Sequence, residues 1–195
     1  MEKLQAKFRG DRARNLHVKR ALRQELIVCP FLSSTPQVVQ DIINLIENNE
    51  IYITNDDIIL DLGCGDGSVL IGLLKQKQIY CKCIGVEIDN ILCKTAIRKI
   101  SDENLNGYIN IIEGDIINTE LYNLNKGTII FTFLVPSCQE IVSKLLKKQC
   151  KKGVYIIAYK FELPKIDGWI PLSISETNDV VKENTKTKLY LYMIE

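Results

Sequence analysis

Histidine and tryptophan are nearly absent from this chain of 195 residues, since each occurs once. The lone histidine, His17, lies in a charged segment, and no Ser-His-Asp or Cys-His catalytic set can be built convincingly around it. No stretch approaches the roughly 20 apolar residues of a transmembrane helix, so we expect no membrane span. The charged N-terminus lacks the apolar core of a secretory signal peptide. A formal net charge of +1 does not call for a nucleic-acid partner.

The cysteines of the chain do not follow the spacing of a known metal-binding motif. The seven cysteines are odd in number and scattered, and Cys81 and Cys83 form the one close pair. Neither a second pair nor histidines stand at ligand spacing, so we expect no metal site. Free thiols fit a reducing compartment, and we expect a cytoplasmic location, with a mitochondrial one as the alternative.

The most informative segment is the glycine-rich stretch of residues 60–67, Leu-Asp-Leu-Gly-Cys-Gly-Asp-Gly. The apolar run 58–60 enters it and the helically spaced apolar segment 69–74 leaves it, which predicts a strand, a tight turn and a helix N-terminus. Glycines let the backbone approach a ligand closely, and the helix N-terminus offers unpaired N–H groups. About twenty residues later, Glu87 ends a second apolar strand, where a carboxylate suits two ribose hydroxyls. A nucleoside-bearing cofactor is therefore expected across the ends of two parallel strands.

The carboxylates around this turn narrow the choice of cofactor. A dinucleotide site would read G-x-G-x-x-G with a pyrophosphate at the helix end. Here Asp61 precedes the first glycine and Asp66 precedes the last. Two carboxylates would repel a phosphate, but they suit the ammonium and sulfonium groups of S-adenosylmethionine. The plainer alternative is a tight turn with solvated acids at the strand ends.

Apolar strands and helices alternate along the rest of the chain. This alternation predicts an α/β fold, a doubly wound, Rossmann-like sheet of mostly parallel strands. Thr35 is the expected N-cap of the first helix, with Pro36 at its first position. Ser173–Asn184 is expected to be a polar loop. Strands are predicted at 58–62, 83–87, 108–112, 128–133, 154–159 and 188–194, and helices at 36–46, 69–75, 92–100 and around 141–146.

Residues 1–27 are predicted to be a basic helical extension, and residues 28–195 a single domain. The first 26 residues hold eight Lys or Arg against three acids. Three interpretations of this extension stay open: a cap packed on the domain, a substrate-docking arm, or a mitochondrial presequence.

The string at 61–67 resembles motif I of the class I methyltransferases, and Glu87 resembles the ribose-binding acid of that superfamily. Asp115, after a third predicted strand, stands where the superfamily commonly contacts adenine. The superfamily also closes its sheet with an antiparallel last strand, for which 188–194 is the candidate. The resemblance implies S-adenosyl-L-methionine as the cofactor, held by Thr35, Asp61, Gly63, Cys64, Gly65, Gly67, Glu87, Ile88, Asp115, Ile116 and Phe133.

A longer resemblance covers about residues 28–195. The segment 30–36, Pro-Phe-Leu-Ser-Ser-Thr-Pro, and the stretch from Tyr159 to Leu163 followed by Gly168-Trp169 resemble the archaeal broad-specificity protein-lysine methyltransferases and the related mitochondrial ATP synthase c-subunit lysine methyltransferases. Ser33 departs from the proline that is frequent there. The N-terminal membrane segment that mitochondrial members often carry is absent from the sequence, which counts against a membrane-embedded target.

This resemblance implies transfer of a methyl group to the amine of a protein lysine. The expected acceptor channel is apolar and is lined by Phe31, Phe133, Leu134, Phe161 and Trp169, with Tyr159 as a further candidate. For each aromatic side chain, plain core packing is the alternative. An RNA or small-molecule methyltransferase of the same fold stays open, as does a non-catalytic module that binds the cofactor.

Overall fold

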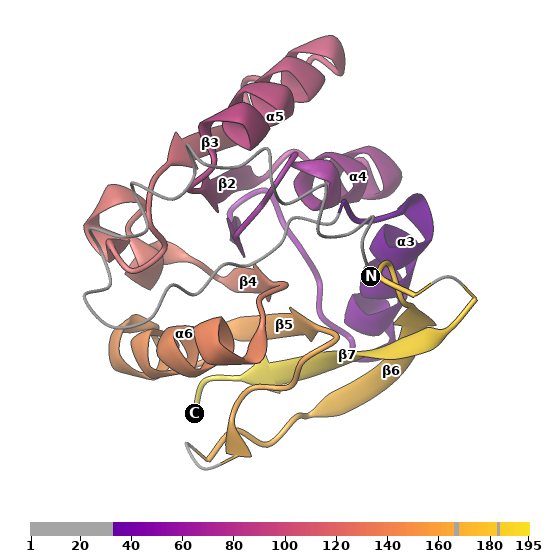
Figure 1. Ribbon diagram of the computed structural model, residues 1–195, viewed down its shortest axis with the longest axis vertical. Coiled ribbons are helices and arrows are strands. Elements are labelled where there is room, and N and C mark those ends of the chain that lie inside the picture. Colours follow the sequence, from indigo (N-terminus) through magenta and orange to yellow (C-terminus); the bar gives the residue numbers. More distant parts are fainter. Residues whose placement is uncertain (1–32, 166–167, 183) are drawn as a thin grey trace, which may run out of the picture. The chain divides into compact units, whose positions relative to one another are not determined.

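A computed structural model describes residues 33–165, 168–182 and 184–195; the predicted extension at 1–27 and Phe31 lie outside them. Within this part, seven strands form one sheet in the order β3-β2-β1-β4-β5-β7-β6 (Figure 1). The strands are β1 (Ile58–Leu62), β2 (Lys82–Glu87), β3 (Ile109–Glu113), β4 (Ile129–Thr132), β5 (Tyr155–Tyr159), β6 (Ser173–Asn178) and β7 (Lys186–Met193). The helices are α3 (Pro36–Asn48), α4 (Ser68–Lys77), α5 (Asn90–Asp102) and α6 (Pro136–Gln149), with the short 3-10 helices η1 (Thr119–Leu121) and η2 (Leu124–Lys126).

The strand order reverses at β1, which pairs in parallel with β2 on one side and β4 on the other. Connections through α4 and α5 carry the chain toward β3, and α6 carries it from β4 toward β5. In a doubly wound sheet, ligands bind outside the carboxyl ends of the strands at such a reversal. β7 runs antiparallel to β5, so the predicted doubly wound sheet with an antiparallel last strand is confirmed.

Two hydrophobic clusters cover the two faces of the sheet. Successive strand residues point to opposite faces, and so Ile59 lies in one cluster while Leu60 and Leu62 lie in the other. The first cluster receives side chains of α3, α4 and α5, and the second receives those of α6. Figure 1 shows α6 apart from the other three helices. Because the parallel strands are buried on both faces, their sequences are nearly continuous apolar runs.

Local sequence signals set several element boundaries. Helix α3 begins where Thr35 accepts a hydrogen bond from the backbone N–H of Val38, with Pro36 at the first helical position, as predicted. Six apolar side chains of α3 are buried along one stripe: Val38, Val39, Ile42, Ile43, Leu45 and Ile46. Strand β1 has the predicted bounds, and the other predicted strands overlap those observed.

One prediction is wrong: residues 173–178 form strand β6 rather than a polar loop. The sequence of this strand does not predict it, because the strand is stabilised by antiparallel pairing with β7, from Ser173↔Leu191 to Asn178↔Lys186. One polar side chain, Thr177, is buried there and donates to Asp41 of α3 at 2.7 Å. In the described ranges, no helix is long and apolar enough to cross a bilayer.

Candidate active site

The glycine turn links the end of β1 to the start of α4. Gly63, Gly65 and Gly67 all have positive φ angles, between 56° and 86°. A Cβ on Gly63 would be strained by its φ of 86° and would approach Leu134 Cδ2 to 3.0 Å. The backbone N–H groups of Gly63 and Cys64 both donate to the carbonyl of Val86. The turn is thus held against the end of β2.

Glu87, the last residue of β2, orients the same turn through its side chain. Its Oε2 accepts from the Gly65 N–H at 2.9 Å. Its Oε1 accepts from the backbone N–H groups of Ile88 and Asp89 at 2.8 and 2.9 Å. Burial raises the pKa of Glu87, and these three backbone donors act in the opposite direction. The carboxylate is therefore fixed at the carboxyl end of β2, beside the turn.

Close packing under the turn explains a glycine in the middle of β2. A Cβ on Gly85 would lie 2.6 Å from Cys64 Sγ and 2.8 Å from Ile111 Cδ1. Cys64 is buried, and burial raises the pKa of its thiol well above the ordinary value. Cys64 therefore acts as a small apolar group supporting the turn rather than as a thiolate nucleophile.

Asp61, in β1, is a buried carboxylate, 5% exposed. Its pKa is raised to about 7, first by burial and then by the negative charges of Glu87 and Asp66. No cation is paired with Asp61 among the residues that the structure describes. A buried carboxylate surrounded by others is costly unless a positive ligand joins it. The turn therefore presents an incomplete electrostatic site for a cation.

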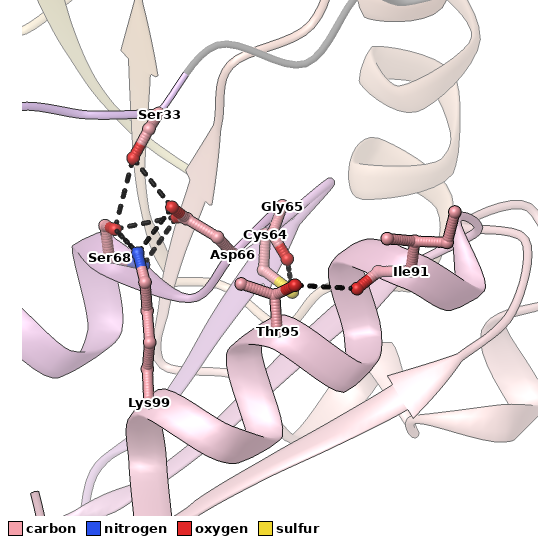
Figure 2. Close-up of polar contacts among 8 residues, drawn as sticks. All are labelled: Ser33, Cys64, Gly65, Asp66, Ser68, Ile91, Thr95 and Lys99. Carbon is pink, nitrogen blue, oxygen red and sulfur yellow. Dashed lines mark hydrogen bonds and ion pairs between the residues drawn. The ribbon is translucent and has the colours of Figure 1, made fainter. Parts of the chain in front are cut away.

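Asp66, in contrast, has a complete set of partners. Figure 2 shows Ser33, Ser68 and Lys99 converging on its carboxylate. Ser33 Oγ donates at 2.8 Å, and Lys99 Nζ from α5 lies at 2.6 Å. Burial acts to raise the pKa of Asp66, but the hydrogen bonds from Lys99, Ser68 and Ser33 outweigh it and lower the pKa. This cluster ties the segment before α3 to the glycine turn and to α5.

The acid expected at the adenine end lies near Glu87. Asp115 follows β3, which pairs with β2 so that Glu87 stands opposite Glu113. The Gly114 N–H donates to the Glu87 carbonyl at 2.9 Å, and Asp115 Oδ1 accepts from the Ile117 N–H at 2.9 Å. Ile116, after β3, is half-buried, and Ile88, after β2, is exposed. The carboxyl ends of β1, β2 and β3 thus hold the predicted cofactor residues, apart from Thr35 and Phe133.

An aromatic pair lies at the carboxyl ends of β4 and β5. Phe133 and Tyr159 meet edge to face, with ring centroids 4.4 Å apart. Leu134, the next residue, lies against Gly63. The Tyr159 hydroxyl donates to the Asn178 carbonyl at 2.6 Å and accepts from the Val180 N–H at 2.9 Å. The segment between β4 and α6 therefore offers an apolar surface next to the glycine turn.

Trp169 does not join this aromatic pair. It is buried in the cluster on the α6 face, 5.6 Å from Tyr192 between centroids, with Lys147 Nζ 5.0 Å from its own centroid. Phe133 and Tyr159 pack in the cluster on the other face. Phe161 is half-buried just beyond β5. The structure therefore groups Phe133 with Tyr159, and separates Trp169 from both.

Sequence reasoning missed two polar features of this region. Gln139 is buried on α6, and Lys160 forms an ion pair with Asp179 at 2.7 Å. Gln139 could have been found, because it interrupts the apolar stripe formed by Val135, Val142 and Leu146. The ion pair joins residues 19 positions apart, and no local pattern indicates it.

These residues fit S-adenosylmethionine. Asp61 is a buried carboxyl group with no cation partner among the described residues, and in its ionised form it complements an ammonium group. Glu87 offers an oriented carboxylate to hydroxyls. The glycine turn leaves backbone close to the ligand space, where a Cβ would intrude. Asp61 and Glu87 disfavour a phosphate in the same place.

Comparison with known proteins gives related sequences and a shared fold. The chain is 27% identical over 165 residues to a protein-lysine N-methyltransferase of Saccharolobus islandicus (strain REY15A), covering 85% of this chain and 93% of that protein. An RNA methyltransferase from Salinibacter ruber, solved in complex with S-adenosyl-L-homocysteine, matches with a TM-score of 0.68 and 20% identity over 84% of this chain and 94% of that one. The tRNA methyltransferase TrmK of B. subtilis matches with a TM-score of 0.59 and 14% identity over 85% of this chain and 67% of that one.

The family model of the ANTKMT methyltransferase domain matches residues 61–171, more than half of the chain. The matched range begins at Asp61 and includes the glycine turn, Glu87, the aromatic pair and Trp169. The expected methyltransferase class is thereby confirmed, and the chain belongs to the ANTKMT methyltransferase domain family.

Proposed function

We propose that this protein is an S-adenosylmethionine-dependent methyltransferase whose acceptor is the side-chain amine of a lysine in a protein. The observation that carries the acceptor class is the 27% identity, over 85% of this chain, to the Saccharolobus protein-lysine N-methyltransferase. The RNA methyltransferases are 20% and 14% identical to this chain, a level that supports a common fold and leaves the acceptor open.

The donor site supports the reaction class. When bound, S-adenosylmethionine supplies an electrophilic methyl group on a positively charged sulfur. Asp61 would hold its ammonium group and Glu87 its ribose hydroxyls, at the carboxyl ends of β1 and β2. Both carboxylates belong to the rigid sheet, so the protein orients the donor without a loop rearrangement at either residue.

The surroundings of the methyl acceptor support a lysine amine as the acceptor, because this amine must lose its proton before it can take up a methyl group. A free lysine has a pKa of about 10.4, and an apolar surrounding favours the neutral form. Phe133, Leu134 and Tyr159 provide such a surrounding beside the glycine turn. The segment 129–135 holds no ionisable side chain. The protein would therefore act by desolvating and positioning the amine, and the proton would leave to water.

The test uses radiolabelled S-adenosylmethionine and an extract of cells that lack the gene, so that acceptors are unmethylated. Labelled protein is hydrolysed and its amino acids are separated, with the Glu87→Ala protein as the matched blank. We expect methyl-lysine in the reaction with wild type and none in the blank. The assay is run under reducing conditions, because the six cysteines among the described residues are free. Free cysteines also support the proposed cytoplasmic location.

Two results would contradict the proposal. Label that disappears with ribonuclease treatment, and is absent from hydrolysed protein, would assign an RNA acceptor instead. Tight donor binding with no transfer to any fraction of the extract would assign a non-catalytic binding module.

A further inference from the structure

Gln139 occupies a position on α6 where the helix pattern calls for an apolar side chain. It lies in the stripe that packs on the sheet, together with Val142 and Leu146, and is 1% exposed. Burying an amide is unfavourable unless its polar atoms find partners. The partners of Gln139 therefore indicate what the residue does.

The side chain of Gln139 joins two segments that follow neighbouring strands. Its Nε2 donates to Thr132 Oγ1 at 3.2 Å and to the Phe161 carbonyl at 3.2 Å. Thr132 is the last residue of β4, directly before Phe133. Phe161 is the second residue after β5. One amide thus links α6, the end of β4 and the start of the connection between β5 and β6.

The chain at Phe161 needs such an anchor because its backbone is strained. The Phe161 N–H donates to the Tyr159 carbonyl at 2.8 Å, which closes a three-residue turn around Lys160. Lys160 has a φ of 69°, the left-handed region that side chains other than glycine rarely adopt. A turn of this kind is strained and persists where its surroundings hold it. The Lys160–Asp179 ion pair holds one side of the turn, and Gln139 holds the other.

Stability alone does not explain a glutamine here. Its Oε1 is buried and has no hydrogen-bond partner among the described residues. A buried acceptor without a partner is unfavourable, and an apolar side chain of the same shape would avoid that cost. The amide is therefore better explained by the position that it imposes on Phe161 than by the free energy of folding.

We propose that Gln139 is a positioning residue for the methyl-acceptor side of the site. Its amide holds the strained turn after β5 against the end of β4. This fixes the backbone at Phe161 relative to Thr132, and thereby relative to Phe133, beside which the acceptor would enter. The role in acceptor entry rests on the proposed function, whereas the role of the Gln139 amide in holding the turn does not.

The chain provides its own reporter, since Trp169 is its one tryptophan and lies on the same connection between β5 and β6. The variant is Gln139→Met, which keeps the length of the side chain and removes both hydrogen bonds. Gln149→Met, at the other end of α6, is the matched control. We expect acrylamide quenching of Trp169 to rise about twofold or more in Gln139→Met and to stay unchanged in the control.

Transfer kinetics give the second measurement. For Gln139→Met we expect the kcat/KM for the acceptor to fall about tenfold, while donor affinity stays within about twofold of wild type. In Gln139→Glu the carboxylate cannot donate to the Phe161 carbonyl, so its activity relative to wild type should recover as the pH falls and the carboxyl is protonated. This pH profile would not follow from a general loss of packing.

The outcomes separate this inference from the proposed function. Unchanged quenching of Trp169 in both Gln139→Met and Gln139→Glu would overturn the positioning role. Increased quenching, in a preparation whose extract assay yields no methyl-lysine, would support the positioning role and contradict the lysine acceptor. A fall in donor affinity as large as the fall in kcat/KM would also overturn the inference, because the effect would then not be confined to the acceptor side.

Discussion

The backbone N–H of Gly65 donates to the Glu87 carboxylate at 2.9 Å, so the turn after β1 and the end of β2 are built as one unit. The other oxygen of Glu87 is held by Ile88 and Asp89. Glu87 is thus oriented before any ligand arrives and keeps acceptor capacity on the oxygen that faces the turn.

Replacing Glu87 by alanine should abolish measurable donor binding. The variant loses the acceptor for the ribose and the orientation of the glycine turn, and hydrogen bonds to a charged group contribute about 1.5–3 kcal/mol each. Calorimetry with S-adenosylmethionine should therefore show affinity reduced by at least about 100-fold. Glu113→Ala is the control, because Glu113 stands opposite Glu87 in register on β3 and is exposed. Wild-type affinity in Glu87→Ala would remove the ribose assignment.

Asp61 should make the donor-free protein less stable as the pH rises. Its pKa is about 7 in the folded protein against 3.8 when exposed, so folding takes up a proton between these values. The stability that this proton provides is complete below pH 3.8 and is lost as the pH rises through about 7. Asp61→Asn should accordingly be more stable than wild type at pH 8, by ~4 kcal/mol at most, and the difference should vanish near pH 4. Denaturant unfolding at the two pH values measures this, and equal stabilities at pH 8 would contradict it.

Donor binding should release a proton from the same residue. A cation beside Asp61 favours the ionised carboxylate, so affinity for S-adenosylmethionine should increase from pH 6 to pH 8. Calorimetric titration at pH 7 in buffers of different ionisation enthalpy should report a fraction of a proton released per donor bound. Asp61→Asn should bind weakly and release none. A wild-type affinity that does not change between pH 6 and pH 8 would show that the ammonium group lies elsewhere.

The Ser33–Asp66 hydrogen bond should slow release of the donor. Ser33 Oγ donates to Asp66 at 2.8 Å and thereby fastens the segment before α3 to the glycine turn (Figure 2). Ser33→Ala should raise the dissociation rate about tenfold or more, since a hydrogen bond to a carboxylate contributes about 1.5–3 kcal/mol. Lys99→Met should have a larger effect, since it leaves Asp66 without its cation. Stopped-flow displacement measures both rates, and Ser34→Ala is the control. Equal rates in Ser33→Ala and Ser34→Ala would argue against this fastening.

Loss of the Phe133 ring should lower methyl transfer more than donor affinity. Phe133→Ala removes the edge-to-face contact with Tyr159 and opens the apolar surface after β4 to water. We expect kcat to fall by about tenfold or more, with donor affinity within about threefold of wild type. Tyr108→Ala disrupts another aromatic pair, with Tyr80, before β3 and serves as the control. If Phe133→Ala transferred methyl at the wild-type rate, the acceptor would not pass this ring.

The structural features that could be predicted from the sequence are those determined by local residue patterns. The apolar run 58–62, the glycines and the capping pair Thr35 and Pro36 each determine their own structure, and the observed boundaries agree. Strand β6 was missed because it is stabilised by the ladder with β7, which lies elsewhere in the sequence. The ion pair of Lys99 with Asp66 spans 33 residues, and no periodicity indicates it. Trp169 illustrates the same limit, since its sequence neighbours did not reveal that it packs on Tyr192.

A crystal structure of the protein with S-adenosyl-L-homocysteine tests the central claim most directly. The account predicts ligand density along the glycine turn, with Glu87 on the two ribose hydroxyls and Asp61 near the amino group. Density for the ligand at another surface, or a nucleotide phosphate bound at the start of α4 in its place, would contradict it.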